Sequence, residues 1–117
     1  FIPSTLAEDA DPLDILIYNE TPINRGTLVE CNIIGALDMT DSGGRDWKIL
    51  GAPTSHVRNY RSLKDIDPMF IKIASYFFKH YKDLNNSFVE VGEWHGKSVA
   101  QTVLKQCYRR HNQIYQC

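Results

Sequence analysis

The run Thr27-Leu28-Val29-Glu30-Cys31-Asn32-Ile33-Ile34-Gly35-Ala36-Leu37-Asp38-Met39-Thr40 decides the fold. It is rich in apolar and β-branched residues, which favour strands. Its central glycine, Gly35, predicts a bulge or bend of the kind that helps a sheet close into a barrel. The next four residues, Asp41-Ser42-Gly43-Gly44, are typical of a hairpin turn, and residues 45–52 return as a second strand. We therefore expect a β-hairpin at the centre of the domain.

Shorter elements are expected on both sides of this hairpin. Upstream, the apolar run 13–18 predicts a buried strand. Downstream, Asp67 is a helix cap and Pro68 suits the first helical position, with apolar residues at four-residue spacing to a helix end near Lys82. Residues 88–94 then alternate as a half-buried strand does.

A last helix is expected after Gly96, with Ser98 as its cap. Strands come first and helices later, with no βαβ alternation and no internal repeat. This order predicts a single α+β domain over residues 1–117, built as a small OB-like antiparallel barrel with two flanking helices.

The composition is that of an ordinary globular protein. Of the 117 residues, 43% are hydrophobic and 23% charged, and the net charge of -1 provides no basic field for nucleic acid. The apolar stretches are far shorter than the roughly 20 residues that cross a bilayer. Three cysteines without a CxxC pair suit free thiols in a reducing cytosol. We expect no nucleic-acid partner, no membrane span and a cytoplasmic location.

The strongest chemical signal is Glu8-Asp9-Ala10-Asp11-Pro12-Leu13-Asp14, which places four carboxylates in seven residues. In an extended chain the side chains of Asp9 and Asp11 would point the same way, and a bend at Pro12 would bring Asp14 to the same site. A hard divalent cation would relieve the repulsion between them. A solvated acidic loop is an equal alternative on charge alone. An EF-hand is excluded because Asp14 stands where such a loop requires glycine.

Two further groups carry charge. Period-2 geometry in the segment after the hairpin turn places Asp46 and Lys48 on one face and Trp47 on the other, with Asp41 across the hairpin. Taken alone, this is an ordinary charged hairpin. At the end of the first helix, a phenol and an ammonium, Tyr81 and Lys82, suit phosphate oxygens, although a lysine there also suits the helix dipole.

Together these segments resemble the family I inorganic pyrophosphatases. The matching motifs, in the family's order, are Asp9-Ala10-Asp11-Pro12-Leu13-Asp14, then Gly35 to Asp41 with Asp46-Trp47-Lys48, then Phe77-Phe78-Lys79-His80-Tyr81-Lys82-Asp83-Leu84. The resemblance covers essentially the whole chain and looks closest to the bacterial branch.

The resemblance implies hydrolysis of pyrophosphate to two phosphates by a metal-activated water, with Mg²⁺ as cofactor. It assigns metal binding to Asp9, Asp14, Asp46 and Asp41, and the role of general base to Asp11. It assigns the phosphate contacts to Lys48, Tyr81 and Lys82. It also implies a homo-oligomer, a hexamer of the bacterial type.

The family supplies further basic, acidic and tyrosine residues from a segment ahead of the position that matches Phe1. We therefore expect that this segment is missing here, that the barrel is incomplete at that end, and that residues 1–117 alone turn over poorly. The alternatives are a non-catalytic OB-like binding module, and a metal-dependent phosphomonoesterase acting on sugar phosphates.

Overall fold

The computed structural model describes residues 1–19, 21–55, 60–81 and 88–115, and in this part of the chain strands precede helices as expected. The elements are β1 (Asp14–Ile17), β2 (Cys31–Asp41), β3 (Gly44–Arg45), β4 (Lys48–Pro53), the 3₁₀ turn η1 (Leu63–Asp65), α1 (Pro68–His80), β5 (Val89–His95) and α2 (Lys97–Tyr115). Neither described helix is long and apolar enough to cross a membrane.

The strands form one sheet in the order β1-β4-β2-β3, with β5 also paired to β2. The central hairpin is confirmed, because β2 pairs antiparallel with β3 and with β4. The second strand expected over residues 45–52 is interrupted, because Asp46 and Trp47 lie between β3 and β4. One pairing departs from the expected antiparallel pattern: β1 runs parallel to β4. Within the described residues β1 has no second neighbour, so the sheet is mixed and open along that edge.

The bulge expected at Gly35 is present. The register between β2 and β4 shifts between Ile33 and Gly35, so β2 uses one more residue than its partner there. The position also needs glycine, since a Cβ on Gly35 would meet the carbonyl oxygen of His95 at 2.5 Å. Because of the shift, Ile33 and Ala36 pack on the same side of the sheet, although simple alternation would separate them.

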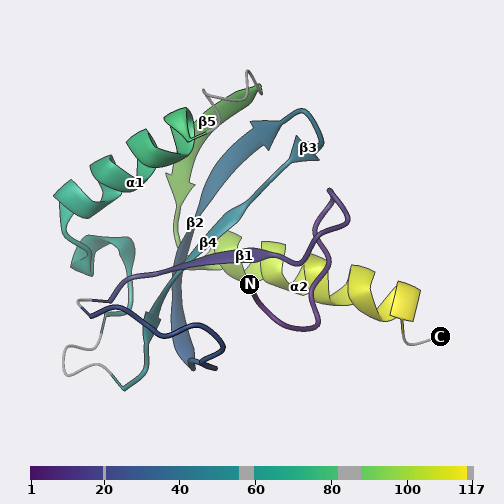
Figure 1. Ribbon diagram of the computed structural model, residues 1–117, viewed down its shortest axis with the longest axis horizontal. Helices are drawn as coiled ribbons and strands as arrows, with labels where there is room; N and C mark the ends of the chain where they lie inside the picture. The colour runs from purple at the N-terminus through teal and green to yellow at the C-terminus, as the bar shows by residue number, and fades with distance from the viewer. Residues whose placement is uncertain (20, 56–59, 82–87, 116–117) are drawn as a thin grey trace.

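Each face of the sheet carries its own core and its own helix (Figure 1). On one face Ile49 of β4 packs with Ala100, Val103 and Cys107 of α2. On the other face Leu50, the next residue of β4, packs with residues that include Phe70 of α1. Adjacent strand residues thus face different helices. By the same alternation, Asp14 and Lys48 lie on the face of the sheet that carries α1.

Other boundaries also differ from those expected. Strand β2 begins at Cys31. Residues 27–29 follow a turn in which Thr27 N donates to Asn24 O at 3.3 Å, and they line a groove, while the Glu30 carbonyl accepts a hydrogen bond from Thr54 N at 3.0 Å. Asp67 does cap α1, accepting from Met69 N at 2.9 Å, but α1 ends at His80, and Lys82 lies outside the described residues.

Ser98 is not the cap of α2. The helix begins at Lys97, and the carbonyl of Gly96 accepts the hydrogen bond from Ala100 N at 3.2 Å. Gly96 therefore occupies the capping position. The Ser98 carbonyl accepts from Thr102 Oγ1 inside the first turns of the helix.

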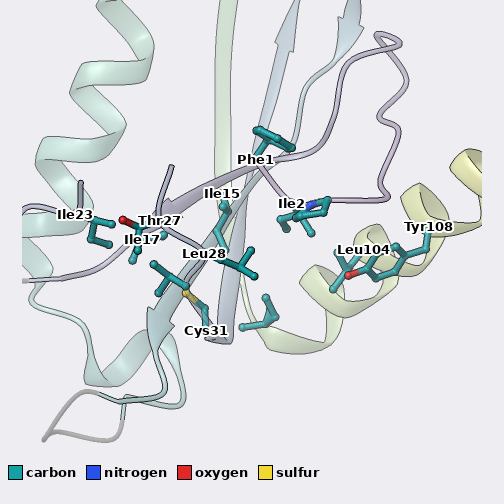
Figure 2. A pocket seen from close by; sticks show the side chains of 13 residues that line it. Phe1, Ile2, Ile15, Ile17, Ile23, Thr27, Leu28, Cys31, Leu104 and Tyr108 are labelled. Atoms are coloured by element: carbon teal, nitrogen blue, oxygen red, sulfur yellow. The ribbon is translucent and has the colours of Figure 1, made fainter. Parts of the chain in front are cut away.

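An apolar groove of about 400 Å³ lies on the α2 side of β1 (Figure 2). Ile15 and Ile17 of β1 form its floor, Leu104 and Tyr108 of α2 stand on one side, and Leu28 lies over it. Leu28 is 88% exposed, so the groove is open to solvent. We call this surface the β1 groove.

Candidate functional site

Strand pairing brings the first two charged groups together. The parallel register of β1 and β4 sets Asp14 beside Lys48, although 34 residues separate them in sequence. The Lys48 Nζ donates to Asp14 Oδ2 at 2.7 Å. The Lys48 side chain is 9% exposed and that of Asp14 is 56% exposed, so this ion pair lies at the rim of the sheet with the ammonium on the inner side.

Asp46 is the second carboxylate that contacts Lys48. Its Oδ2 lies 3.0 Å from the same Lys48 Nζ, and its side chain is also 9% exposed. The predicted alternation is confirmed, because Asp46 and Lys48 meet while Trp47 packs against the α2-side core. A buried carboxylate and a rim carboxylate thus share one ammonium. We call Asp14, Asp46 and Lys48 the acidic triad.

Burial and charge act on the triad in opposite directions. Burial raises the pKa of Asp46 above its ordinary value, the hydrogen bond from Lys48 opposes this, and the nearby charges of Asp9 and Asp41 raise it further. Burial alone would lower the pKa of Lys48, yet the hydrogen bonds to Asp14 and Asp46 outweigh it and raise the pKa. At neutral pH the ammonium is therefore charged and firmly held.

The Asp9 loop reaches the hairpin by a tight turn and not in the extended form expected. Ala10 has a φ of 70°, Ala10 N donates to Ala7 O, and Asp11 N donates to Asp9 Oδ1 at 3.1 Å. The extended expectation was wrong because the Asp9 carboxylate binds a backbone amide two residues on, as short acidic side chains do in turns. Asp11 itself is exposed.

This turn lies against the tip of the β2–β3 hairpin. A Cβ placed on Gly43 would approach the Asp9 Cβ to 3.7 Å, and Asp41 Oδ1 accepts from Gly43 N at 2.9 Å. Asp9 and Asp41 also act on the charge of Asp46. The structure therefore gathers four of the five predicted carboxylates, those of Asp9, Asp14, Asp41 and Asp46, around one end of the sheet.

The end of α1 approaches the same region. The Lys48 Nζ lies 5.8 Å from the centre of the Phe78 ring, and that ring packs edge-on against Tyr81 at 6.0 Å. Tyr81 is thereby connected to the triad through one aromatic ring. Lys82, the other predicted phosphate contact on this helix, lies outside the described residues.

The donors here suit a hard cation, although the described residues do not form a preformed cage. Within the described ranges, no three His, Cys, Asp or Glu side chains converge closely enough to hold a metal ion as they stand. The triad nevertheless places two carboxylates around a single cationic group, with two more nearby. Carboxylate oxygens are the ligands preferred by Mg²⁺ and Ca²⁺, so the residues fit such an ion chemically.

Two features escaped the sequence interpretation. The direct pairing of Asp14 with Lys48 depends on a parallel register between distant strands, which no local pattern reveals. The contact between Phe78 and Lys48 depends on how α1 crosses the sheet. The only signal in the sequence for the latter is that Phe78 stands three residues before Tyr81, on the same helical face.

Comparison with known proteins shows which family the chain resembles. The family model described as inorganic pyrophosphatase matches residues 1–112. An inorganic pyrophosphatase of Geobacillus stearothermophilus is 36% identical over 115 residues, covering 97% of this chain and 70% of the relative. That of Rickettsia prowazekii is 39% identical over 111 residues, covering 91% of this chain and 64% of the relative.

The fold is shared as well. The crystal structure of an inorganic pyrophosphatase from Neisseria gonorrhoeae superposes with a TM-score of 0.90 at 36% identity, over 96% of this chain and 67% of that one. This likeness confirms the expected α+β, OB-like sheet with two flanking helices. The chain spans 64% to 70% of the lengths of the two sequence relatives. The family match and these identities together show that the chain belongs to the inorganic pyrophosphatases, a family of diphosphate-hydrolysing enzymes.

Proposed function

We propose that this protein hydrolyses inorganic pyrophosphate to two phosphates at the acidic face around Asp14, Asp46 and Lys48. The observation that carries the proposal is the acidic triad, in which a buried carboxylate and a rim carboxylate meet one ammonium at 3.0 and 2.7 Å. Pyrophosphate is a dense polyanion, so its site must combine cation-binding carboxylates with cationic groups of the protein. Family membership supports the same reaction.

The proposed cofactor is Mg²⁺, held by Asp9, Asp14 and Asp46, with Asp41 contributing to a further ion. When bound, the ions neutralise the diphosphate and lower the pKa of the attacking water. The support lies in the all-oxygen donor set and in the charges of Asp9 and Asp41 that act on Asp46. Mg²⁺ is favoured over a transition metal because no histidine or thiolate is part of this group.

The remaining roles follow from position and chemistry. Asp11 is the proposed general base, since it is an exposed carboxylate next to the Asp9 turn and can accept a proton from water. Lys48 and Tyr81 are the proposed phosphate contacts, because an ammonium and a phenol donate to phosphate oxygens. Lys82 is included by its sequence match alone.

We also propose that residues 1–117 by themselves turn over slowly. The chain spans about two thirds of its relatives' length. Within the described residues, Lys48 is the cation that contacts Asp14 and Asp46. Stabilising a transferring phosphoryl group usually takes several cationic contacts. A low rate is therefore compatible with an intact metal site.

Phosphate release from pyrophosphate tests the function. We expect slow release that requires Mg²⁺, and a further loss of roughly 10²- to 10⁴-fold in Asp11→Asn, the range for removing a general base. Glu93→Gln, an exposed carboxylate on β5, is the matched control and should keep the parental rate. Unchanged release by Asp11→Asn would remove Asp11 from the proposal, and release from sugar phosphates at equal rate would point to a phosphomonoesterase.

Assembly and location form the last part of the proposal. A homo-oligomer, a hexamer in the intact protein, is supported by the exposed apolar residues of α1, namely Met69, Ile73, Tyr76 and Phe77. A cytoplasmic location is supported by the free thiols of Cys31 and Cys107. Light scattering on the protein measures the assembly directly, and a monomeric mass across the micromolar range would contradict it.

A further inference from the structure

The position that a metal cation would take between Asp14 and Asp46 is already occupied by a cationic group of the protein, the Lys48 ammonium. The Lys48 Nζ lies 2.7 Å from Asp14 Oδ2 and 3.0 Å from Asp46 Oδ2, within hydrogen-bond distance of both. Both carboxylates are proposed metal ligands, and Lys48 is a proposed phosphate contact. In this arrangement the same three groups that should serve metal and substrate serve one another.

The arrangement is set by the fold and not by a flexible surface contact. The β1–β4 register places the Asp14 and Lys48 backbones opposite each other. The Lys48 and Asp46 side chains are each 9% exposed, so their contact is shielded from solvent. A buried carboxylate without a counterion is strongly unfavourable, so Asp46 keeps Lys48 until another cation replaces it.

From this geometry we propose that Lys48 is a built-in counterion of the metal site, which a divalent ion must displace from Asp14 and Asp46 before the ammonium can bind phosphate. The inference rests on the proposed metal-binding role of these two carboxylates. It makes binding ordered, with the metal first and the anion second. It also makes Lys48 an internal competitor that weakens metal binding in the absence of an anion.

The neighbourhood offers the released ammonium a place to go. The Phe78 ring lies 5.8 Å from the Nζ, and Tyr81 packs on that ring, so a small rotation of the lysine stem keeps the charge over an aromatic face near a proposed phosphate contact. The ammonium then meets an anion on the side of α1. The two binding events become coupled through one side chain.

Calorimetric titration of MgCl₂ into the metal-free chain tests the competition. Lys48→Met keeps most of the stem and removes the competing charge, so Mg²⁺ should bind more tightly than in the parent by between roughly 5- and 150-fold, the usual range of coupling between sites. Lys72→Met removes an exposed lysine of α1 and should leave the affinity unchanged. Inorganic phosphate should bind the parent only when Mg²⁺ is present, and in the presence of Mg²⁺ it should bind Lys48→Met more weakly than the parent, because the released ammonium is absent.

Each outcome is decisive. Equal or weaker Mg²⁺ binding by Lys48→Met, in a variant whose circular dichroism matches the parent, overturns the inference and leaves the metal site standing. No Mg²⁺ binding by the parent or by any variant overturns the metal site and the inference with it. A second measurement uses the parent alone. The NMR signals of the Lys48 ε-methylene should shift during the Mg²⁺ titration, and the dissociation constant from these shifts should equal the one from calorimetry. Signals unmoved at saturating Mg²⁺ would contradict displacement.

Discussion

The two faces of β1 are opposite in character although the strand has only four residues. On the α1 side, the surface is charged, and Asp14 forms an ion pair with the buried Lys48. On the α2 side, Ile15 and Ile17 form the floor of the open β1 groove. The difference shows that the parallel pairing with β4 fixes both surfaces at once, because alternation along one strand sends neighbouring residues to opposite faces.

The comparison predicts that the covered and open parts of the α2 face differ in stability. Ile49 is 0% exposed in the α2-side core, so Ile49→Ala should lower the free energy of unfolding by roughly 2–5 kcal/mol. Ile17 lines the open groove, and Ile17→Ala should cost about 1 kcal/mol or less. Urea denaturation measures both. Equal losses would mean that the groove is as well packed as the core.

Substitution of Asp14 on the charged face should weaken Mg²⁺ binding and hardly change stability. The Asp14 side chain is 56% exposed, so Asp14→Asn should change the free energy of unfolding by less than about 1 kcal/mol. Loss of a proposed metal ligand should weaken Mg²⁺ binding by at least roughly tenfold, which is the lower limit seen even for groups that only support a ligand. Calorimetry and urea denaturation on one preparation separate the two effects. A large stability loss with intact Mg²⁺ binding would reverse the assignment.

The charged face should also carry an alkaline stability limit. The carboxylates raise the pKa of Lys48 above its ordinary 10.5, so the folded state holds this proton more tightly than the unfolded chain. The resulting stabilisation is complete below about pH 10.5 and is lost as the pH rises through the folded-state pKa. The free energy of unfolding of the metal-free chain should therefore fall more steeply between pH 8 and 11.5 in the parent than in Lys48→Met, as measured by denaturation at each pH. Parallel curves would show that the ion pairs are not stabilising in solution.

The smallest stability effect is expected at the groove's outer edge. Leu28 is 88% exposed, so Leu28→Ser should change the free energy of unfolding by no more than about 0.5 kcal/mol. It should nevertheless lower the fluorescence of a hydrophobic dye such as ANS, because the residue lines the β1 groove. Thr54→Ala, an exposed change outside the groove lining, is the control. Undiminished dye binding would place the exposed apolar surface elsewhere.

Much of the fold was predictable because its signals are local. The hairpin turn after Thr40, the bulge at Gly35 and the Asp67 cap each depend on residues close together in sequence. The pairing of Asp46 with Lys48 was predictable for the same reason, since two residues of extended chain place side chains on one face. The parallel β1–β4 register was not, because it joins segments that only tertiary packing brings together.

The boundaries and the acidic loop failed for physical reasons. Residues 27–29 have strand composition but belong to no strand of the described residues, and they line the β1 groove. Ser98 has the chemistry of a cap, yet Gly96 occupies that place. The Asp9 loop turned because the Asp9 carboxylate binds the Asp11 amide, a competition between side chain and extended backbone that charge counting ignores.

The central claim is that the charged face of β1 binds a divalent cation and that this ion prepares it for a diphosphate. Its most direct test is calorimetric titration of imidodiphosphate, a pyrophosphate analogue resistant to hydrolysis, into the chain with and without saturating Mg²⁺. The account predicts binding only with Mg²⁺, abolished in Asp46→Asn, which removes the buried carboxylate that contacts Lys48. Binding of equal strength in the absence of Mg²⁺, or unaltered by Asp46→Asn, would contradict it.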